Sequence, residues 1–283
     1  MSLDQINAAR LGLDRFSELG IAVKRRGPEA PRATIVYIHG LGESSLCFDA
    51  LICDPRLDGW QHLAIDLLGY GRSTWPERPF DLEQHAASIE LLLDRLKIKE
   101  AVLVGHSMGS VIALLLAERG RLQVPFLLDI EGNVTFDDCA YSRIASGQTL
   151  EHWLENGYGD FIDHIHYMAE VGNASTDESK EGARVMRAYG ASAHFCDPRT
   201  LYRDAVDLVR LSKTDELAGR RGATGVPMVY FHGDPRGTGD RSLGQLHDAG
   251  IKTRAFSPAG HWPFLDQHDD FVEAMVEVLE KHS

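Results

Sequence analysis

Short runs of apolar, often β-branched residues alternate along the chain with longer segments whose apolar residues recur every three or four positions. Runs of the first kind are typical of buried strands, and repeats of the second kind are typical of amphipathic helices. Their alternation predicts a mostly parallel sheet with helices on both faces. The runs that we interpret as strands are 21–24 (expected at a sheet edge), 34–38, 62–66, 101–104, 126–130, 228–231 and 253–256.

Three segments carry the clearest helical pattern. Between residues 82 and 96 the apolar side chains follow the spacing of an amphipathic helix, and residues 269–279 form a final helix near the end of the chain. Residues 111–117 are apolar on almost all sides. This predicts a helix packed directly against the sheet.

The stretch 133–213 differs from the rest because the strand pattern disappears and helical, aromatic-rich sequence replaces it. We interpret it as a helical cap inserted after the sixth strand of an eight-stranded sheet. The chain then divides into a core (1–132), the cap (133–213) and the remainder of the core (214–283). The aromatic residues of the predicted cap include Trp153, Tyr158, Phe161, Tyr167, Tyr189 and Phe195.

Composition narrows the choice of partner and compartment. The formal net charge is −13 and no basic stripe occurs, so we expect no nucleic-acid partner. No apolar stretch approaches the roughly 20 residues that span a bilayer, and residues 1–15 lack the pattern of a signal peptide. The four irregularly spaced cysteines predict reduced thiols. Together these features predict a cytoplasmic protein without a membrane partner.

The segment 102–110 reads Val-Leu-Val-Gly-His-Ser-Met-Gly-Ser, which contains the pattern G-x-S-x-G between a strand pattern and a helix pattern. This context indicates a nucleophile turn rather than a chance match. A serine on a sharp strand-to-helix bend is strained, and side chains at Gly105 and Gly109 would collide with neighbouring chain. The helix that follows directs backbone N–H groups toward an oxyanion formed at Ser107.

At this point the chain resembles the α/β-hydrolase family. The segment 39–42 (His-Gly-Leu-Gly) resembles the oxyanion loop of the family, and 260–264 (Gly-His-Trp-Pro-Phe) resembles its histidine loop. The segment 66–73 resembles its D-x-P-G-x-G-x-S loop, with Leu68 where proline is usual. Here Asp66 is expected to tie down its own loop.

Several site roles follow from the chemistry of a serine nucleophile together with this resemblance. A serine hydroxyl needs a general base, and His261 lies where the family carries it, after a strand and before the final helix. His39 and His106 are interpreted as structural. The oxyanion hole is expected to use the backbone N–H groups of Leu41 and Met108.

The acidic member of the triad is less clearly placed, because the family usually reads G-x-x-D after the strand 228–231. Here Asp234 directly follows the glycine. Glu131 lies at the end of the preceding strand, a place where some relatives carry the acid, and we favour it. Asp234 and Asp240 stay open as alternatives, and Glu131 could instead be a structural carboxylate that accepts backbone N–H groups.

The predicted function is a serine hydrolase that cleaves an ester of a small, mostly apolar substrate through an acyl-enzyme. Carbon–carbon bond hydrolases, lactonases and perhydrolases keep the same triad and remain alternatives. A non-catalytic small-molecule receptor on this fold is a remote one. No cofactor or metal is expected, because His164 and His166 stand at alternate positions of a helix and do not face each other. The sequence leaves the oligomeric state open.

Overall fold

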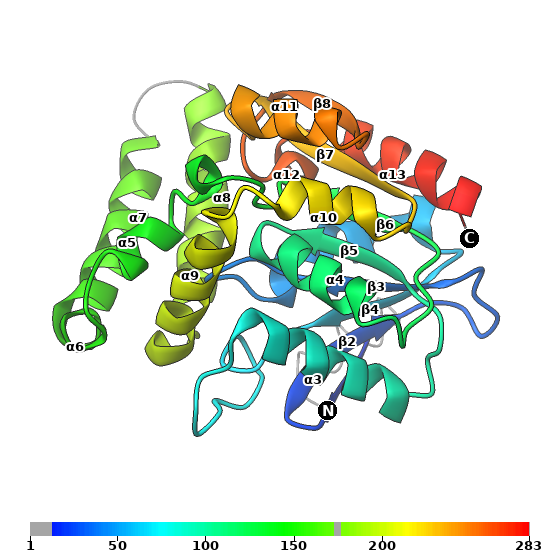
Figure 1. The fold of residues 1–283 in the computed structure, drawn as a ribbon, viewed down its shortest axis with the longest axis horizontal. Helices are drawn as coiled ribbons and strands as arrows, with labels where there is room; N and C mark the ends of the chain where they lie inside the picture. Colours follow the sequence, from blue (N-terminus) through cyan, green and yellow to red (C-terminus); the bar gives the residue numbers. More distant parts are fainter. Residues whose placement is uncertain (1–12, 173–176, 283) are drawn as a thin grey trace.

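The computed structural model describes residues 13–172 and 177–282, which fold around one central sheet (Figure 1). The sheet has eight strands in the order β1-β2-β4-β3-β5-β6-β7-β8, and the predicted fold class is confirmed. The strands are β1 (Asp14–Glu18), β2 (Ile21–Arg26), β3 (Thr34–Ile38), β4 (Gln61–Ile65), β5 (Val102–His106), β6 (Leu127–Ile130), β7 (Met228–Pro235) and β8 (Lys252–Ala259).

Strands β3 to β8 are parallel to their neighbours, whereas β1 and β2 are paired antiparallel, β1 with β2 and β2 with β4. The expectation that residues 21–24 form an edge strand is therefore wrong, because β1 covers that edge. The apolar pattern does not predict strand β1, because Phe16 is the only apolar residue in its sequence, DRFSE. The strand is also largely exposed. An edge strand with one solvated face needs no continuous apolar run.

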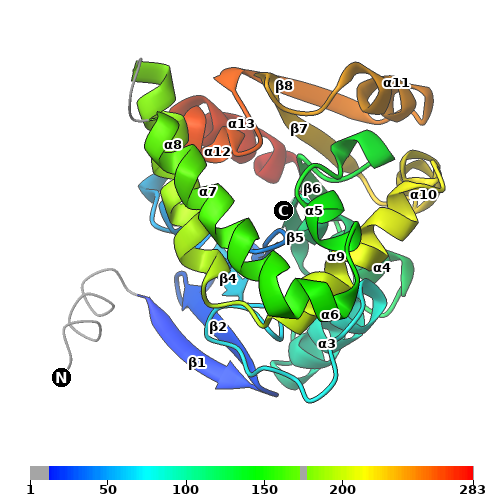
Figure 2. The same ribbon diagram turned by 90° about the vertical axis from the view of Figure 1, so that its left-hand side faces the viewer.

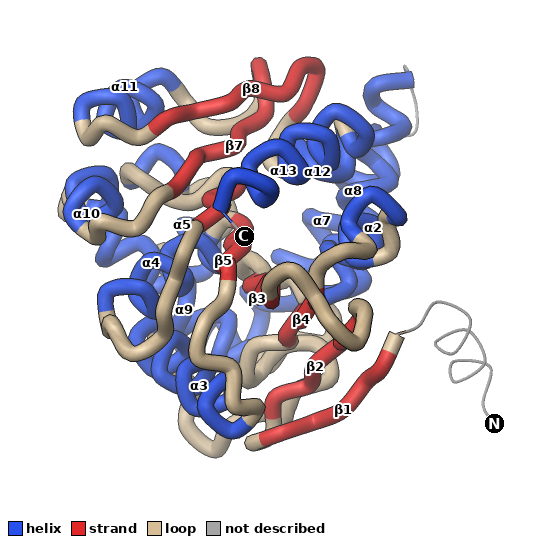
Figure 3. Tube along the Cα trace, turned by 90° about the vertical axis from the view of Figure 1, so that its right-hand side faces the viewer, coloured by secondary structure: helices blue, strands red, loops and turns tan. Residues whose placement is uncertain are grey.

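Helices cover both faces of the sheet (Figure 3), with α3, α4 and α10 on one side and α13 on the other. Helix α4 is buried at every position from Met108 to Leu116, as its all-round apolar sequence requires. The helices of the core are α2 (Asp49–Ile52), α3 (Leu82–Arg95), α4 (Met108–Glu118), α10 (Leu217–Ala223), α11 (Asp240–Asp248), α12 (Pro263–Asp266) and α13 (His268–His282), with 3₁₀ turns at Ser45–Phe48 and Pro55–Leu57.

Between β6 and α10 the described residues form helices and no strand, and these helices lie together across one end of the sheet (Figure 2). Trp153 and Phe161 are fully buried among them, while Tyr167 and Phe195 are exposed. The division of the chain at residues 132 and 213 stays a prediction. The inserted helices are α5 (Ser142–Ser146), α6 (Leu150–His152), α7 (Tyr158–Gly172), α8 (Asp177–Ala193) and α9 (Pro198–Ser212), with a 3₁₀ turn at Phe136–Asp138 and a π-helical turn at Trp153–Gly157.

Two further predictions concern single features of the chain. Cys47, Cys53, Cys139 and Cys196 are free thiols, as predicted. Within the described ranges, no helix has both the length and the apolar character needed to cross a bilayer. Most of the segment 1–15, on which the expectation about a signal peptide rests, lies outside the described residues.

Candidate active site

Ser107 lies on the sharp bend between β5 and α4. Its backbone has φ 53° and ψ −122°, a strained conformation that L residues adopt only where the surroundings enforce it. The two glycines of the motif allow this bend, because a Cβ at Gly105 would lie 2.5 Å from the Cα of Ser110, and one at Gly109 would lie 2.0 Å from the carbonyl oxygen of Ile38. The serine is thereby presented at the end of a rigid, buried strand.

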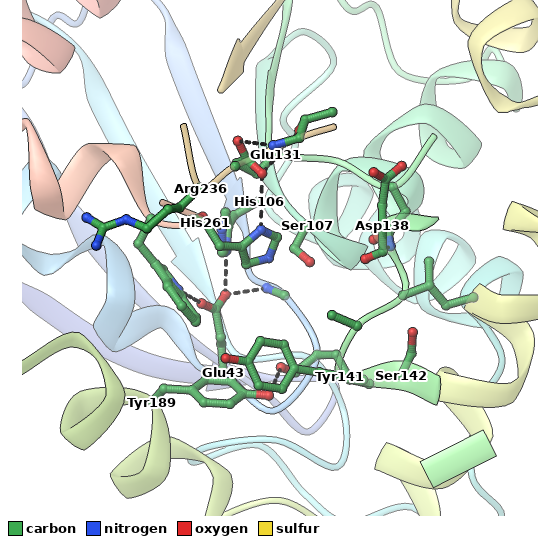
Figure 4. Close-up of a pocket in the computed structure, with 18 of the residues that line it drawn as sticks. Glu43, His106, Ser107, Glu131, Asp138, Tyr141, Ser142, Tyr189, Arg236 and His261 are labelled. Atoms are coloured by element: carbon green, nitrogen blue, oxygen red, sulfur yellow. Dashed lines mark hydrogen bonds and ion pairs between the residues drawn. The ribbon is translucent and has the colours of Figure 1, made fainter. Parts of the chain in front are cut away.

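The neighbouring strand also holds the backbone of this turn. The Ser107 N–H donates to the carbonyl of Ile130 at 2.8 Å, and Ile130 is the residue before Glu131. Among the described residues the Ser107 hydroxyl forms no hydrogen bond. In a site without substrate such catalytic contacts are often long and tighten only when substrate binds. Figure 4 shows Ser107 beside His261, with its hydroxyl directed into a cavity.

Glu131 and His261 form a hydrogen bond, with 3.2 Å between Oε2 of the carboxylate and Nδ1 of the ring. The end of β7 and the loop after it fix the carboxylate: Oε1 accepts from the N–H of Gly233 at 2.7 Å and of Thr238 at 3.2 Å, and Oε2 accepts from the Thr238 hydroxyl at 3.1 Å. Glu131 itself has φ 51°. The side chain is therefore held in one orientation, facing the ring.

The electrostatics of Glu131 favour its charged form. Burial raises the pKa of this carboxyl, but the hydrogen bond and charge of His261 and the two backbone N–H donors outweigh burial, so the pKa lies below its usual value. A carboxylate on Nδ1 keeps the proton on that nitrogen, which leaves Nε2 as the basic atom of His261.

The structure brings neither alternative acid to His261. Asp234 is exposed near the end of β7, and Asp240 is the exposed first residue of α11. Within the described ranges, neither side chain forms a hydrogen bond or ion pair with His261, whereas Glu131 does. The signal that pointed to Glu131 was its place at a strand end before Gly132.

The two expected oxyanion donors belong to segments next to Ser107, since Met108 follows it in the chain and a Cβ at Gly40, the residue before Leu41, would lie 3.1 Å from the Ser107 Cβ. Met108 is the first residue of α4, where backbone N–H groups have no acceptor within the helix. Leu41 lines the cavity from the loop after β3, and its carbonyl accepts from the Tyr189 hydroxyl at 3.0 Å. Gly42 has φ 75°, and a Cβ there would lie 2.7 Å from the same hydroxyl oxygen. The loop thus depends on a glycine for its contact with α8.

A second buried carboxylate, Glu43, lies next to the site and was missed by sequence reasoning. Its Oε2 accepts from the N–H of Gly40 at 2.6 Å and lies 2.9 Å from Nδ1 of His106, and its Oε1 accepts from the Trp262 indole at 2.5 Å. Nε2 of His106 lies 2.8 Å from the carbonyl oxygen of His261. No sequence motif distinguishes Glu43, because two of its partners, His106 and Trp262, come from distant segments.

Glu43 and His106 stabilise each other as ions. Burial raises the pKa of Glu43, but the charge and hydrogen bond of His106, with the Trp262 and Gly40 donors, lower it to about 2. Burial lowers the pKa of His106, but Glu43 and the His261 carbonyl outweigh it and the pKa lies above its usual value. Both partners of the His106 ring are acceptors, so satisfying both requires a proton on each nitrogen.

The cavity above Ser107 has a volume of about 620 Å³. Ser107, Glu131 and His261 line it together with residues of the inserted helices (Figure 4). The apolar and aromatic side chains of its wall are Leu41, Tyr141, Met168, Tyr189, Leu208 and Trp262, and polar members include Asn133, Asp137, Asp138 and Arg236.

The remaining predicted roles concern residues away from Ser107. Asp66 does tie down its loop, since Oδ2 accepts from the N–H of Arg72 at 2.9 Å and Oδ1 from that of Ser45 at 2.7 Å. His39 is structural, because its ring bonds the backbone of Gly40 and Leu67.

The histidines of α7 were not expected to hold a metal. Nε2 of His166 lies 2.9 Å from Nε2 of His194, which follows α8. No group of three or more side chains suited to hold a metal ion occurs in the part of the chain that the structure describes.

Comparisons with solved structures match the whole fold. An esterase from Thermogutta terrifontis superposes with a TM-score of 0.76 at 16% identity, covering 96% of this chain and 99% of the other. The enol-lactonase from Burkholderia xenovorans LB400 gives a TM-score of 0.73 at 19% identity, with 94% and 100% covered. At these identities the likeness concerns the fold alone.

Sequence relatives match over shorter segments. Lipase LipV of Mycobacterium tuberculosis is 33% identical over 119 residues, which is 42% of this chain and 44% of the relative. The probable lysophospholipase BODYGUARD 2 of Arabidopsis thaliana is 35% identical over 92 residues, 30% of this chain and 20% of the relative. The matches thus span less than half the length of these curated relatives. The model of the alpha/beta hydrolase family matches residues 35–274, and the chain belongs to that family.

Proposed function

We propose that this hydrolase cleaves the ester bond of a small substrate through a covalent acyl-enzyme, with Ser107 as nucleophile, His261 as general base and Glu131 as the acid. The observation that carries the proposal is the arrangement around one cavity: a strained serine at a strand-to-helix bend beside an imidazole whose far nitrogen is bound by a buried carboxylate. This is the arrangement that activates a serine hydroxyl.

In each of the two half-reactions, His261 first accepts a proton and then donates it. His261 Nε2 takes the hydroxyl proton as Ser107 Oγ attacks the carbonyl carbon, and the imidazolium then gives that proton to the departing alcohol. Water attacks the resulting acyl-enzyme, with His261 first accepting a proton and then returning it to Ser107. The N–H groups of Leu41 and Met108 stabilise the oxyanion, at about 3 kcal/mol for each donor. The chain's own residues and water supply every group in this scheme.

The cavity supports a small substrate with a mostly apolar body. A volume of about 620 Å³ suits a ligand of drug-like size or smaller, and aromatic side chains form much of the wall. A lactone is a cyclic ester and would follow the same steps. The structural similarity to an enol-lactonase makes lactones the second substrate class to test.

Labelling of Ser107 tests the proposal most directly. A fluorophosphonate probe reacts only with an activated serine, so the wild-type protein should be labelled and Ser107→Ala should not. Hydrolysis of short-chain p-nitrophenyl esters should fall about a thousandfold or more in Ser107→Ala. Ser88→Ala is the matched control, because the Ser88 hydroxyl bonds only the His85 carbonyl.

The same experiment separates an enzyme from a receptor that keeps the fold. A wild-type protein that binds a small ligand but neither reacts with the probe nor hydrolyses any ester or lactone would refute the proposal.

A further inference from the structure

The end of the cavity that faces His261 across Ser107 is formed by the segment that follows β6. Figure 4 shows Asp138 on this side, with Ser107 between it and His261. Asn133 and Asp137 line the same end. These residues take no part in the proposed chemistry, so their arrangement bears on what the cavity binds.

Asp138 is held rigidly through one of its two carboxylate oxygens. Oδ2 accepts from the N–H groups of Val134 at 2.9 Å and Thr135 at 2.8 Å and from the Ser242 hydroxyl at 2.7 Å. Oδ1 has no hydrogen-bond donor, and no basic side chain pairs with Asp138, within residues 13–172 and 177–282. By contrast, the adjacent Asp137 forms an ion pair with Arg241 at 3.3 Å. Asp138 therefore offers one oriented acceptor without a partner.

Asn133 adds a second acceptor. Its side chain is 2% exposed, and its amide nitrogen donates to the carbonyl of Asp138 at 3.0 Å and approaches the Sγ atom of Cys139 at 3.8 Å. These contacts fix the amide orientation, because the reverse would place two oxygens against each other. Oδ1 is left buried without a hydrogen-bond partner. Oδ1 has almost no accessible surface, so it adds negative potential beside Asp138 and leaves direct contact with a ligand to the Asp138 carboxylate.

We infer that this end of the cavity binds a primary ammonium group of the substrate, at a distance from the ester bond. Carboxylate and amide oxygens can only accept hydrogen bonds, and an ammonium group supplies up to three donors together with a compensating charge. As a statement about substrate, the inference rests on the proposed function, because it assumes that the cavity holds an ester. It names the substrate class as esters with an apolar body and a cationic end.

Binding of benzylammonium to Ser107→Ala tests the site without any need for turnover. Its dissociation constant should be at least about tenfold lower than that of benzyl alcohol, since hydrogen bonds to charged groups are the stronger ones. Ligand-observed NMR titration measures both constants.

Asp138→Asn is the informative variant. Its amide oxygen can keep the three bonds that Oδ2 accepts, while its amide nitrogen replaces the unpaired oxygen with a donor. In the Ser107→Ala background it should weaken benzylammonium binding about tenfold or more and leave benzyl alcohol almost unchanged. Asp215→Asn removes the same charge from a carboxylate that pairs with Arg241 outside the cavity, and it should change either constant less than twofold.

Hydrolysis extends the test to substrates. Three aryl acetates of matched shape, 4-(ammoniomethyl)phenyl, 4-(hydroxymethyl)phenyl and 4-ethylphenyl acetate, differ only in the group at the far end. The wild-type kcat/KM should be highest for the ammonium ester, and Asp138→Asn should abolish that preference.

Failure of the ammonium site and failure of the esterase function would give different results. Equal binding of benzylammonium to Ser107→Ala with and without Asp138→Asn, or no binding to either, overturns the ammonium site even when all three esters are hydrolysed. Selective benzylammonium binding in a protein that hydrolyses no ester leaves the site standing and rejects the esterase function.

Discussion

Two carboxylate–imidazole pairs lie side by side in this molecule, and they differ in one respect. Glu131–His261 and Glu43–His106 have carboxylates of similar burial, with side chains 3% and 4% exposed. The His261 side chain is 27% exposed and the His106 side chain is 1% exposed. His106 bonds acceptors through both nitrogens, whereas His261 lines the cavity with only its Nδ1 engaged.

Under the proposed mechanism, this difference decides which of the two pairs can act on substrate. Each ring is held by a carboxylate, but only a ring with a free, accessible nitrogen can exchange a proton with substrate. The closed pair instead joins segments far apart in sequence. Glu43 contacts Gly40 in the loop of the proposed oxyanion donor Leu41 and Trp262 beside the proposed base, and His106 holds the backbone of His261.

The largest expected effect comes from removing the charge of the open pair. Glu131→Gln should lower kcat/KM about a thousandfold to ten-thousandfold, because the neutral amide no longer stabilises the imidazolium. Asp234→Asn is the matched control and should stay within a few-fold of wild type. Steady-state kinetics on a p-nitrophenyl ester measure both. An inactive Asp234→Asn beside a nearly normal Glu131→Gln would reverse the assignment of the acid.

The closed pair should contribute to stability at neutral pH. The pKa of Glu43 falls from 4.5 to about 2 on folding, so its stabilisation is present above pH 4.5 and is lost as the pH falls toward 2. A shift of this size corresponds to about 3 kcal/mol. Urea unfolding of the wild type and Glu43→Gln at several pH values measures it. The stability difference between them should shrink on acidification, and a constant difference would contradict the assignment.

A smaller effect is expected on turnover. Glu43→Gln should lower kcat about tenfold to a hundredfold with little change in KM. The substitution weakens the contacts that position the proposed oxyanion loop and His261, and these groups are proposed to act in the transition state. The pH dependence of kcat should also shift in this variant, since the negative charge beside His106 and His261 is lost. Mutation to Asp would restore part of the rate by restoring the carboxylate.

Asp54→Asn is the matched control for this variant. The Asp54 carboxyl bonds Arg56 and His268, and these bonds hold its pKa at about 2 as well, but Asp54 does not line the cavity. It should cost stability and leave kcat unchanged. Equal losses of kcat in Glu43→Gln and Asp54→Asn would show that Glu43 only stabilises the fold.

The sequence predicted those features that depend on local pattern. The bend at Ser107 follows from two glycines between a strand and a helix, and the fold follows from the alternation of apolar runs. Strand β1 was missed because an exposed edge strand carries no such run. Glu43 was missed because its importance lies in contacts with residues up to 219 positions away, which no local pattern records.

The choice between Glu131 and Asp234 shows the same limit in a different form. Both follow strands at the same edge of the sheet, so sequence order alone leaves both within reach of His261. The structure separates them because the N–H groups of Gly233, near the end of β7, and of Thr238, in the loop that follows, orient the Glu131 carboxylate toward the ring. This orientation depends on the backbone geometry of the neighbouring strand and its loop.

The hydrogen bond from the Tyr189 hydroxyl to the Leu41 carbonyl ties the roof of the cavity to its catalytic floor. A movement of α8 that separates the Tyr189 hydroxyl from Leu41 would break this bond and free the loop that carries one of the proposed oxyanion donors. We therefore expect the position of α8 and the geometry of the proposed oxyanion hole to be coupled.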